Sequence, residues 1–392
     1  MPAEDQAELA LLRAIFEANP DDDEPRFIYA DYLQQRGDPR GELIALQCRA
    51  ARDPNDEVAH RALNLFDVDE SRWLGAWHGE AIAWKFHKGF VDHLTIPINS
   101  FVILGELLFA RESFPHELVH LRSLELRDSR SSGEPSLSSL VAILERLRLH
   151  TLSLQLVVGT ELAQTLASSA ALAHLTTLRL SEAPHDPDVP AVLCRGMSNR
   201  FHALELVNCR LTRNEARSLA GETRFAQVRR LDLTSSDEPG VDAIVELLTA
   251  SSKLTSLELR GNGCYVPELH EHLLGERVVR GVLGRRQPPL VELGLGNTGT
   301  LTEDLSALAR IVTLQRLDVR GNPIEDRALD TLLGLPNLPT LNLAHTRISV
   351  AGAARLVRDA PPSLRELTLT VPALPDALVA ALRARFTLHR WR

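Results

Sequence analysis

Leucines recur along the chain in one phrase, Leu-x-x-Leu-x-Leu, in which apolar and polar positions alternate over the last residues. Clear copies are LTSLELRGN at Leu254–Asn262, LQRLDVRGN at Leu314–Asn322 and LPTLNLAHT at Leu338–Thr346. Alternation with a period of two is typical of a strand with one buried face. A unit this short cannot bury its apolar face alone, so the units must stack on one another. The pattern therefore predicts a solenoid from about residue 90 onward.

Eleven units can be counted when each is indexed by the first leucine of its Leu-x-Leu pair. Neighbouring index leucines lie 24 to 36 residues apart, which leaves room for one strand and one helix per unit. The index residues are Leu94, Leu124, Leu152, Leu178, Leu204, Leu231, Leu257, Leu293, Leu317, Leu341 and Leu367. We expect helices at Leu137–Leu147, Glu161–Ala170, Asn214–Ala220, Val241–Ala250, Glu303–Ile311, Ala328–Leu333 and Gly352–Asp359.

A small polar residue ends the phrase in eight of the eleven units. It can donate a hydrogen bond to loop backbone, which needs partners where the chain turns. These residues are Asn99, Ser129, Cys209, Ser236, Asn262, Thr298, Asn322 and Thr346. The pattern over residues 90–392 resembles the ribonuclease-inhibitor-like class of leucine-rich repeats. The resemblance implies an α/β horseshoe with a parallel sheet on its concave face and helices on its convex face.

Residues 1–75 do not follow the repeat and are expected to form about four short helices. The break at Asn19–Pro25 and the run Gly37-Asp38-Pro39 separate them, since acids and proline suit helix starts and glycine suits helix ends. The stretch Leu11–Gln47 resembles the bacterial repeat-companion domain, with Tyr32, Gln35 and Gly41 as departures. That family implies no enzymatic activity. The matching residues are Ala14, Ile15, Pro20, Asp22, Arg26, Tyr29, Ala30, Asp31, Leu33, Gly37, Asp38, Glu42, Ile44 and Gln47.

We therefore predict two domains, a small all-α cap at 1–75 and a leucine-rich-repeat domain at 76–392. Solenoid ends need caps. Aromatic residues around Trp73–Phe86 are expected to close the first end, and a helix at Leu374–Arg385 the last. The polar residues of the first domain are either a docking surface or an internal network of ion pairs and hydrogen bonds, and the network is the favoured interpretation. They are Arg26, Tyr29, Asp31 and Glu42.

Composition restricts the class of protein. The net charge of −9 comes from residues 1–75, with 17 acidic and 8 basic residues, while the remainder holds 35 of each. Without a basic stripe, we expect no nucleic-acid partner. Four scattered cysteines favour the reducing cytoplasm over a disulfide framework. The acidic start lacks the pattern of a secretory signal, and no apolar run is long enough to span a membrane.

One segment has the sequence of a zinc-protease motif. His116, Glu117 and His120 match H-E-x-x-H, in which two histidines on one helix face bind zinc and the glutamate acts as general base. Pro115 and the leucines of the next repeat instead indicate a turn entering a strand, where the two histidines would be about 13 Å apart. No phosphate-binding or nucleophile motif is present, and Cys209 is interpreted as structural. We expect no metal and no cofactor.

Strand alternation also predicts which side chains face the concave side. Three columns flank the inward leucines and contain no Trp, Tyr or Phe, the usual anchors of tight interfaces. Glu205, Asp232 and Glu258 should form a stack of like charges, with Arg230 and Arg260 placed to compensate. The candidate binding residues are Arg179, Glu205, Arg230, Asp232, Glu258, Arg260, Arg316, Asp318 and Arg320.

The sequence therefore predicts a non-enzymatic, monomeric protein-interaction module. Its partner would be another protein, bound along the concave face or at the insertion of residues 264–289, which carries four arginines. Two alternatives stay open: a zinc-dependent hydrolase using the HELVH segment, and a structural spacer whose concave face is only solvated.

Overall fold

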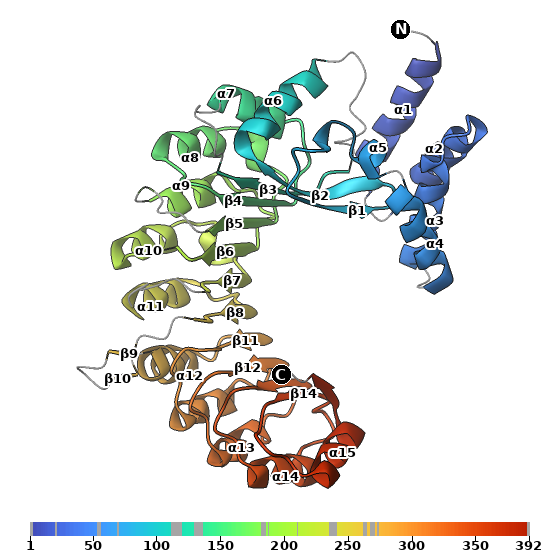
Figure 1. Ribbon diagram of the computed structural model, residues 1–392. Coiled ribbons are helices and arrows are strands. Elements are labelled where there is room, and N and C mark those ends of the chain that lie inside the picture. Colours follow the sequence, from blue (N-terminus) through green and yellow to red (C-terminus); the bar gives the residue numbers. More distant parts are fainter. Residues whose placement is uncertain are drawn as a thin grey trace. The chain divides into compact units, whose positions relative to one another are not determined.

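The structure is a computed structural model, which describes residues 3–19, 22–52, 56–68, 70–110, 120–128, 136–181, 186, 188–209, 211–234, 241–261, 265–266, 271–272 and 274–389 (Figure 1). The chain divides into two compact units. The first consists of Met1–Leu156 and Thr165–Leu175, and the second of Val157–Gln164 and Thr176–Arg392. None of the helices in the described ranges combines the length and the apolar character needed to cross a bilayer.

The first unit begins with five helices. Helix α2 begins after Asp23 with Glu24 and Pro25 in its first turn, as the acids and proline of this segment predict. It ends before Gly37, which has a φ of 71°. The helices are α1 (Ala3–Glu17), α2 (Glu24–Gln35), α3 (Arg40–Arg52), α4 (Asp56–Val68) and α5 (Glu70–Leu74).

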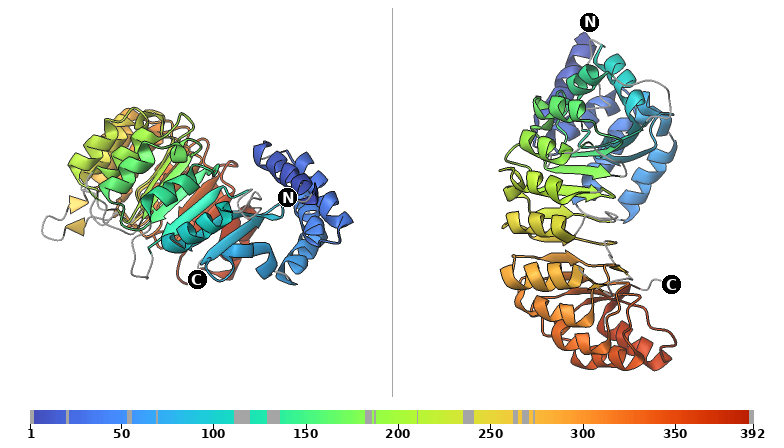
Figure 2. Two further views of the ribbon diagram at one scale, coloured as in Figure 1. Left: turned by 90° about the horizontal axis from the view of Figure 1, so that it is seen from above. Right: turned by 90° about the vertical axis from the view of Figure 1, so that its left-hand side faces the viewer.

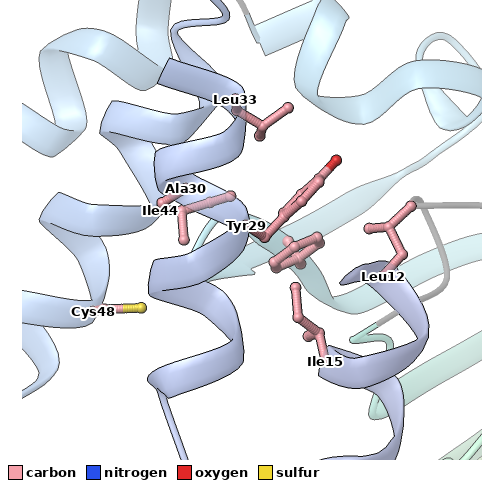
Figure 3. Packing of buried hydrophobic residues seen from close by; sticks show 8 residues of the cluster. Leu12, Ile15, Tyr29, Ala30, Leu33, Ile44 and Cys48 are labelled. Atoms are coloured by element: carbon pink, nitrogen blue, oxygen red, sulfur yellow. The ribbon is translucent and has the colours of Figure 1, made fainter. Parts of the chain in front are cut away.

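The first three helices share a core with a strand. Tyr29, Ala30 and Leu33 of α2 pack between Leu12 and Ile15 of α1 and Ile44 and Cys48 of α3 (Figure 3). Phe90, from the second strand of the unit, completes this cluster and is fully buried. Burial of the same apolar surface therefore holds the helices and the start of the sheet in one compact unit.

The sheet of the first unit starts with a hairpin and continues in parallel. Strand β1 (Ala83–His87) pairs antiparallel with β2 (Phe90–Pro97), which pairs in parallel with β3 (Ser123–Arg127), and β3 with β4 (Thr151–Gln155). Helix α6 follows β2, and α7 follows β3. The remaining bounds are η1 (Gly75–Trp77), α6 (Ile98–Phe109), α7 (Leu137–Leu144), η3 (Ala170–Leu172) and α8 (Thr160–Ala167), the last shared between the two units.

The second unit repeats one strand and one helical segment. Its parallel strands follow the order β5, β6, β7, β8, β11, β12, β13, β14 and β15, and helices α9, α10 and α11 lie side by side along the strands (Figures 1 and 2). The strands are β5 (Thr177–Ser181), β6 (Ala203–Val207), β7 (Arg230–Asp232), β8 (Ser256–Glu258), β11 (Glu292–Gly294), β12 (Arg316–Asp318), β13 (Thr340–Leu343), β14 (Glu366–Leu369) and β15 (Thr387–His389). The helical segments are α9 (Val189–Gly196), α10 (Arg213–Ala220), η4 (Phe225–Gln227), α11 (Val241–Ala250), η5 (Leu274–Leu283), α12 (Gly284–Arg286), η6 (Thr302–Arg310), η7 (Asp326–Ala328), α13 (Leu329–Leu332), α14 (Val350–Asp359) and α15 (Asp376–Arg385).

The index leucines confirm the leucine-rich-repeat solenoid. Each of the eleven lies in a strand and is at most 1% exposed. Within each unit they are direct register partners, for example Leu204 with Leu231 and Leu317 with Leu341. Leucines stacked strand after strand bury the face that no single repeat could bury alone. The fold is therefore an α/β repeat fold with a helical N-terminal part, as the sequence predicts.

The helical side differs from the prediction in detail. Helices α6 and α9 were not predicted, and the segment at Glu303–Ile311 is a 3-10 helix, η6. In the long repeat, the helical position is taken by the π-helix η5 and the short α12, and the extra residues contribute a small hairpin of β9 (Tyr265–Val266) and β10 (Glu271–His272).

Four of the eight residues that end the phrase, Thr298, Thr346, Cys209 and Asn322, bond to backbone carbonyls at the turns, as predicted. Thr298 donates to the carbonyl of Leu295 (2.7 Å), Thr346 to that of Leu343 (2.7 Å), and the Cys209 thiol to that of Leu180 (3.3 Å). The interpretation of Asn99 as a turn residue was wrong, because Asn99 lies inside helix α6. Ser129, Ser236 and Asn262 lie outside the described residues.

Candidate functional site

The nine predicted binding residues, here called the strip, lie on five strands of the second unit or just after them. Parallel register places Arg179 opposite Glu205, Glu205 opposite Asp232, and Asp232 opposite Glu258. Gly294 separates Glu258 from Asp318 in the same column. The column that strand alternation predicted is therefore present, with a glycine at one of its positions.

The carboxylates form the floor of the strip. Glu205, Glu258 and Asp318 are only 16–24% exposed. At the ends of β7, β8 and β12, an acid accepts a hydrogen bond from the backbone N–H of the second residue after it. Asp232 accepts from Thr234 (2.8 Å), Glu258 from Arg260 (3.1 Å) and Asp318 from Arg320 (3.0 Å). These acids thus satisfy backbone donors of the turns, a structural role that the sequence did not reveal.

The arginines stand above this floor. Their side chains are 29–63% exposed. Most of their ion pairs are longer than a hydrogen bond: Arg179 and Arg230 reach Glu205 at 3.8 and 3.6 Å, and Arg320 reaches Asp318 at 3.6 Å. Arg260 makes a closer contact, 3.0 Å from its Nη2 to Glu258 Oε2, and no other strip arginine does so within the part of the chain that the structure describes. Such exposed pairs hold the guanidinium groups weakly.

A hollow of about 480 Å³ opens between these side chains. Seven of the nine strip residues line it, and Glu205 and Arg320 do not. At the hollow, the Glu258 carboxylate leans over Gly294. Any side chain at position 294 would collide with this carboxylate. The lining residues that sequence reasoning left out of the site are Val207, Thr234, Ser256, Leu257, Glu292, Leu293 and Gly294.

Two of the floor carboxylates, Glu258 and Glu205, resist ionisation. Burial raises the pKa of Glu258 and outweighs the attraction of Arg260, while Asp232 and Asp318 raise it further. Burial also raises the pKa of Glu205, with Asp232 adding to the effect against Arg230 and Arg179. The stack of like charges predicted from the sequence is therefore incompletely compensated by the neighbouring arginines.

Replacing Glu258 with glutamine is expected to raise the free energy of unfolding at neutral pH. The folded protein holds the proton of the Glu258 carboxyl more tightly than the unfolded chain does. The free energy of unfolding of the wild type therefore falls as the pH rises from 4.5, the ordinary pKa of this group, through the higher pKa that it has in the folded state. The glutamine side-chain oxygen can still accept the hydrogen bond from the backbone N–H of Arg260, but the side chain no longer titrates. Urea denaturation across this pH range measures the effect.

The matched control is Glu246→Gln on α11. Hydrogen bonds from Arg217 and Arg213 lower the pKa of Glu246, so its contribution has the opposite sign. The stability that Glu246 provides is present above pH 4.5 and is lost as pH falls through the lower folded pKa. This variant is therefore expected to be less stable than wild type at neutral pH. If both variants were less stable than wild type at neutral pH, this would contradict the interpretation that the ionised Glu258 carboxylate destabilises the folded protein.

Of the three motif residues His116, Glu117 and His120, the structure describes His120. His116 and Glu117 lie outside the described residues. His120 is 4% exposed, accepts a hydrogen bond from Arg26 at 3.0 Å and stacks on His87. Burial, together with Arg122 and Arg26, lowers the pKa of His120 to about 2. Among the described residues, no group of three or more His, Cys, Asp or Glu side chains is arranged to hold a metal ion.

The polar residues singled out in the N-terminal helices mostly have partners inside the first unit. Arg26 is 1% exposed and bonds the carbonyl of Asp22 as well as His120. Tyr29 donates to Glu8 at 2.8 Å, and Glu42 pairs with Arg61. Asp31 is exposed. For Arg26, Tyr29 and Glu42, these contacts agree with an internal network rather than a docking surface.

The basic run of the insertion is also partly engaged. Arg277 pairs with Asp242 of α11, and Arg280 Nε lies 2.7 Å from the buried carboxylate of Asp304. Arg286 donates to the carbonyl of Thr249. Three of its four arginines therefore join neighbouring repeats on the helical side.

Comparisons with known proteins found one family model and several solved structures that are similar to parts of this chain. A family model described as Leucine Rich repeat matches residues 312–333. An internalin (inlF) from Listeria monocytogenes is similar over 64% of this chain and 65% of its own, with 17% identity and a TM-score of 0.38. The TLR13 chain of a TLR13–ssRNA13 complex is similar over 70% of this chain and 36% of its own, with 19% identity and a TM-score of 0.42. The alignments thus span less than two thirds of either protein. A search of curated proteins found no match.

Proposed function

We propose that the protein is a non-enzymatic recognition module that binds another protein along the strip. The observation that carries this proposal is the hollow of about 480 Å³, which gathers seven of the nine strip residues on an exposed sheet face. Side chains fixed on neighbouring strands present a pattern that a partner can match in shape and charge. Such a sheet needs little conformational change to bind.

The strip is favoured over the insertion as the binding surface. In the insertion, arginines pair with Asp242 and Asp304 of adjacent repeats. In the strip, the pairs of Arg179, Arg230, Arg316 and Arg320 are all longer than 3.5 Å. Guanidinium groups held this weakly can turn towards a partner at low cost.

The remaining features of the proposal follow from the sequence. We infer a bacterial repeat-companion domain at 1–75, ribonuclease-inhibitor-like repeats at 76–392, a cytoplasmic location and a monomeric state. The internal contacts of Arg26 and Tyr29 support a structural role for the first domain. The scattered cysteines support a reducing compartment.

A pull-down with a charge-reversed strip tests the proposal. The variant changes Arg230, Arg260, Arg316 and Arg320 to glutamate, and its captured proteins are compared with those of wild type. The matched control reverses four paired arginines on the helical side, Arg195, Arg213, Arg217 and Arg327. Both variants change the net charge equally, and thermal unfolding checks that both are folded.

We expect specific partners to be lost from the strip variant and retained by the helical-side control. A strip variant that captures the same proteins as wild type would remove the strip as the binding surface. Capture of no specific protein by wild type, with both variants folded, would instead favour the structural spacer.

A further inference from the structure

In the strip, the acidic side chains lie closer to the sheet than the ends of the arginine side chains. Three of its four acids, Asp232, Glu258 and Asp318, are partly buried and accept hydrogen bonds from backbone N–H groups. Its arginines are longer and extend further outward, and two of them, Arg230 and Arg316, are 54% and 63% exposed and only loosely paired. An approaching partner therefore meets the guanidinium groups before the carboxylates, although the strip carries nearly equal numbers of both.

Two of the arginines converge over a glycine. The turn residues after β8, β11 and β12 that continue this column are Arg260, Gly296 and Arg320. A Cβ atom built on Gly296 would lie 3.3 Å from Arg260 Cγ and 3.1 Å from Arg320 Cγ. The two side chains thus flank Gly296 from both sides, with no side chain between them.

One donor of this pair lacks an acceptor. The Nε–H of Arg260 is buried and has no hydrogen-bond partner in the described part of the chain. Arg320 approaches its own acid, Asp318, only at 3.6 Å. A buried donor without an acceptor is costly, and carboxylates bind guanidinium groups with two parallel hydrogen bonds. Because Arg260 Nε itself is buried, a partner's carboxylate can reach the pair only through the exposed parts of the two side chains, which are 38% exposed for Arg260 and 29% for Arg320.

We propose that the partner of the strip is an acidic polypeptide segment, with carboxylates that pair with Arg230 and Arg316 and with Arg260 and Arg320 over Gly296. This inference rests on the proposed function and specifies the partner's chemistry. A basic segment would have to pass the arginines to reach the acids of the floor. A nucleic acid carries closely spaced phosphates, about one charge per 1.7 Å of duplex, whereas the five arginines of the strip alternate with four carboxylates and form no continuous basic surface.

The interaction is electrostatic in character. The strip offers no Trp, Tyr or Phe to anchor a partner. Affinity then depends on exposed charge pairs, which salt screens: the Debye length falls from about 10 Å at 0.1 M to about 3 Å at 1 M ionic strength. The complex is therefore expected to be weak and to weaken further as salt is added.

Fluorescence anisotropy with labelled probes and the full chain tests the proposal. The probes are an oligo-glutamate peptide, an oligo-lysine peptide of the same length and a single-stranded RNA. We expect the glutamate peptide to bind most tightly and to dissociate between about 0.1 and 1 M salt. Arg260→Gln with Arg320→Gln should weaken its binding about tenfold. The matched control, Arg213→Gln with Arg217→Gln on α10, should leave binding unchanged.

Gly296→Asp provides a second variant. This variant places a carboxylate of the chain itself between Arg260 and Arg320. It should therefore weaken the binding of the glutamate peptide without removing either arginine. Tighter binding of the lysine peptide or of the RNA, equal effects of the strip and control variants, or no binding of the glutamate peptide would each overturn the acidic-partner proposal. If the pull-down still loses partners with the strip variant, the proposed function survives such a result; if neither experiment depends on the strip, both proposals fail.

Discussion

Replacing Asn322 with alanine is expected to lower the free energy of unfolding by about 2–6 kcal/mol, because at least two buried backbone donors lose their acceptor at about 1–3 kcal/mol each. Asn322 is 2% exposed and connects two successive turns. Its Oδ1 accepts the N–H groups of Thr298 and Thr300, both at 3.1 Å. Its Nδ2 donates to the carbonyls of Leu295 (2.6 Å) and Val319 (2.9 Å). Chemical denaturation measures the loss, and hydrogen exchange should locate it in the turns after β11 and β12.

Two further variants separate the hydrogen bonds from the general cost of removing an asparagine. Asn337 is exposed and donates a single bond to the carbonyl of Val312, so Asn337→Ala should cost well under half as much. Asn322→Asp keeps the acceptor but turns an oxygen towards the carbonyls of Leu295 and Val319, so it should also destabilise the protein. Equal losses for Asn322→Ala and Asn337→Ala would show that the buried network contributes nothing.

The strands could be predicted because their signal is local and repeated. Alternation places Leu124 or Leu257 inward whatever the neighbouring repeat contains, and both are buried. The helices were harder to predict from the sequence. Helix α9 follows Asp188, which has a φ of 68°, and carries Pro190 in its first turn, so this stretch has the composition of a loop. Helix α6 begins directly after β2, where the repeat phrase indicates a turn.

The turns after the strands also share a backbone conformation that leaves a local signal in the sequence. Among the described residues of the second unit, the fourth residue after the index leucine has a positive φ in five repeats. Most of these residues are asparagine or glycine, which adopt this conformation at little cost. They are Asn208, Gly261, Asn297, Gly321 and His345.

The candidate site was predictable as a set of columns but not as a geometry. Alternation alone placed Glu258 and Asp318 on one face. It could not show that their oxygens are bonded to backbone N–H groups, because those bonds depend on how each strand ends. The role of Gly294 was also hidden, since a glycine gives no sign of which neighbour occupies its space. Tertiary partners likewise decide that Arg280 is engaged by Asp304.

Gly41 shows how the structure changes the meaning of a departure from a family pattern. In the repeat-companion pattern, alanine is usual at this position. Here a Cβ atom on Gly41 would collide with the carbonyl oxygen of Ala30, because α3 crosses α2 closely at this point. The sequence alone did not explain this departure, whereas the close packing of α2 and α3 explains why glycine is needed there.

Replacing Gly89 with alanine is expected to lower the free energy of unfolding by about 2–5 kcal/mol, the sum of a left-handed backbone penalty and overpacking. Gly89 has a φ of 84° in the hairpin between β1 and β2. Its N–H donates to Gln47 (2.6 Å) and its carbonyl accepts from Arg40 (3.3 Å), so α3 is fixed against it. A Cβ atom there would collide with Ile44 Cγ1 and lie 3.2 Å from Ile44 Cα. Because the backbone of α3 is this close, the clash cannot be relieved by rotating one side chain.

Gly79→Ala isolates the backbone part of this effect. Gly79 has a φ of 86° and has nothing within 4 Å of its would-be Cβ atom, so alanine there should cost only about 1–2 kcal/mol. Adding Ile44→Ala to Gly89→Ala should make the two losses less than additive, because the smaller side chain leaves room for the new methyl group. Urea denaturation of the four variants and wild type completes the cycle. Equal losses for Gly79→Ala and Gly89→Ala, or strict additivity with Ile44→Ala, would show that the close contact between the hairpin and α3 does not hold the helical part onto the first strands.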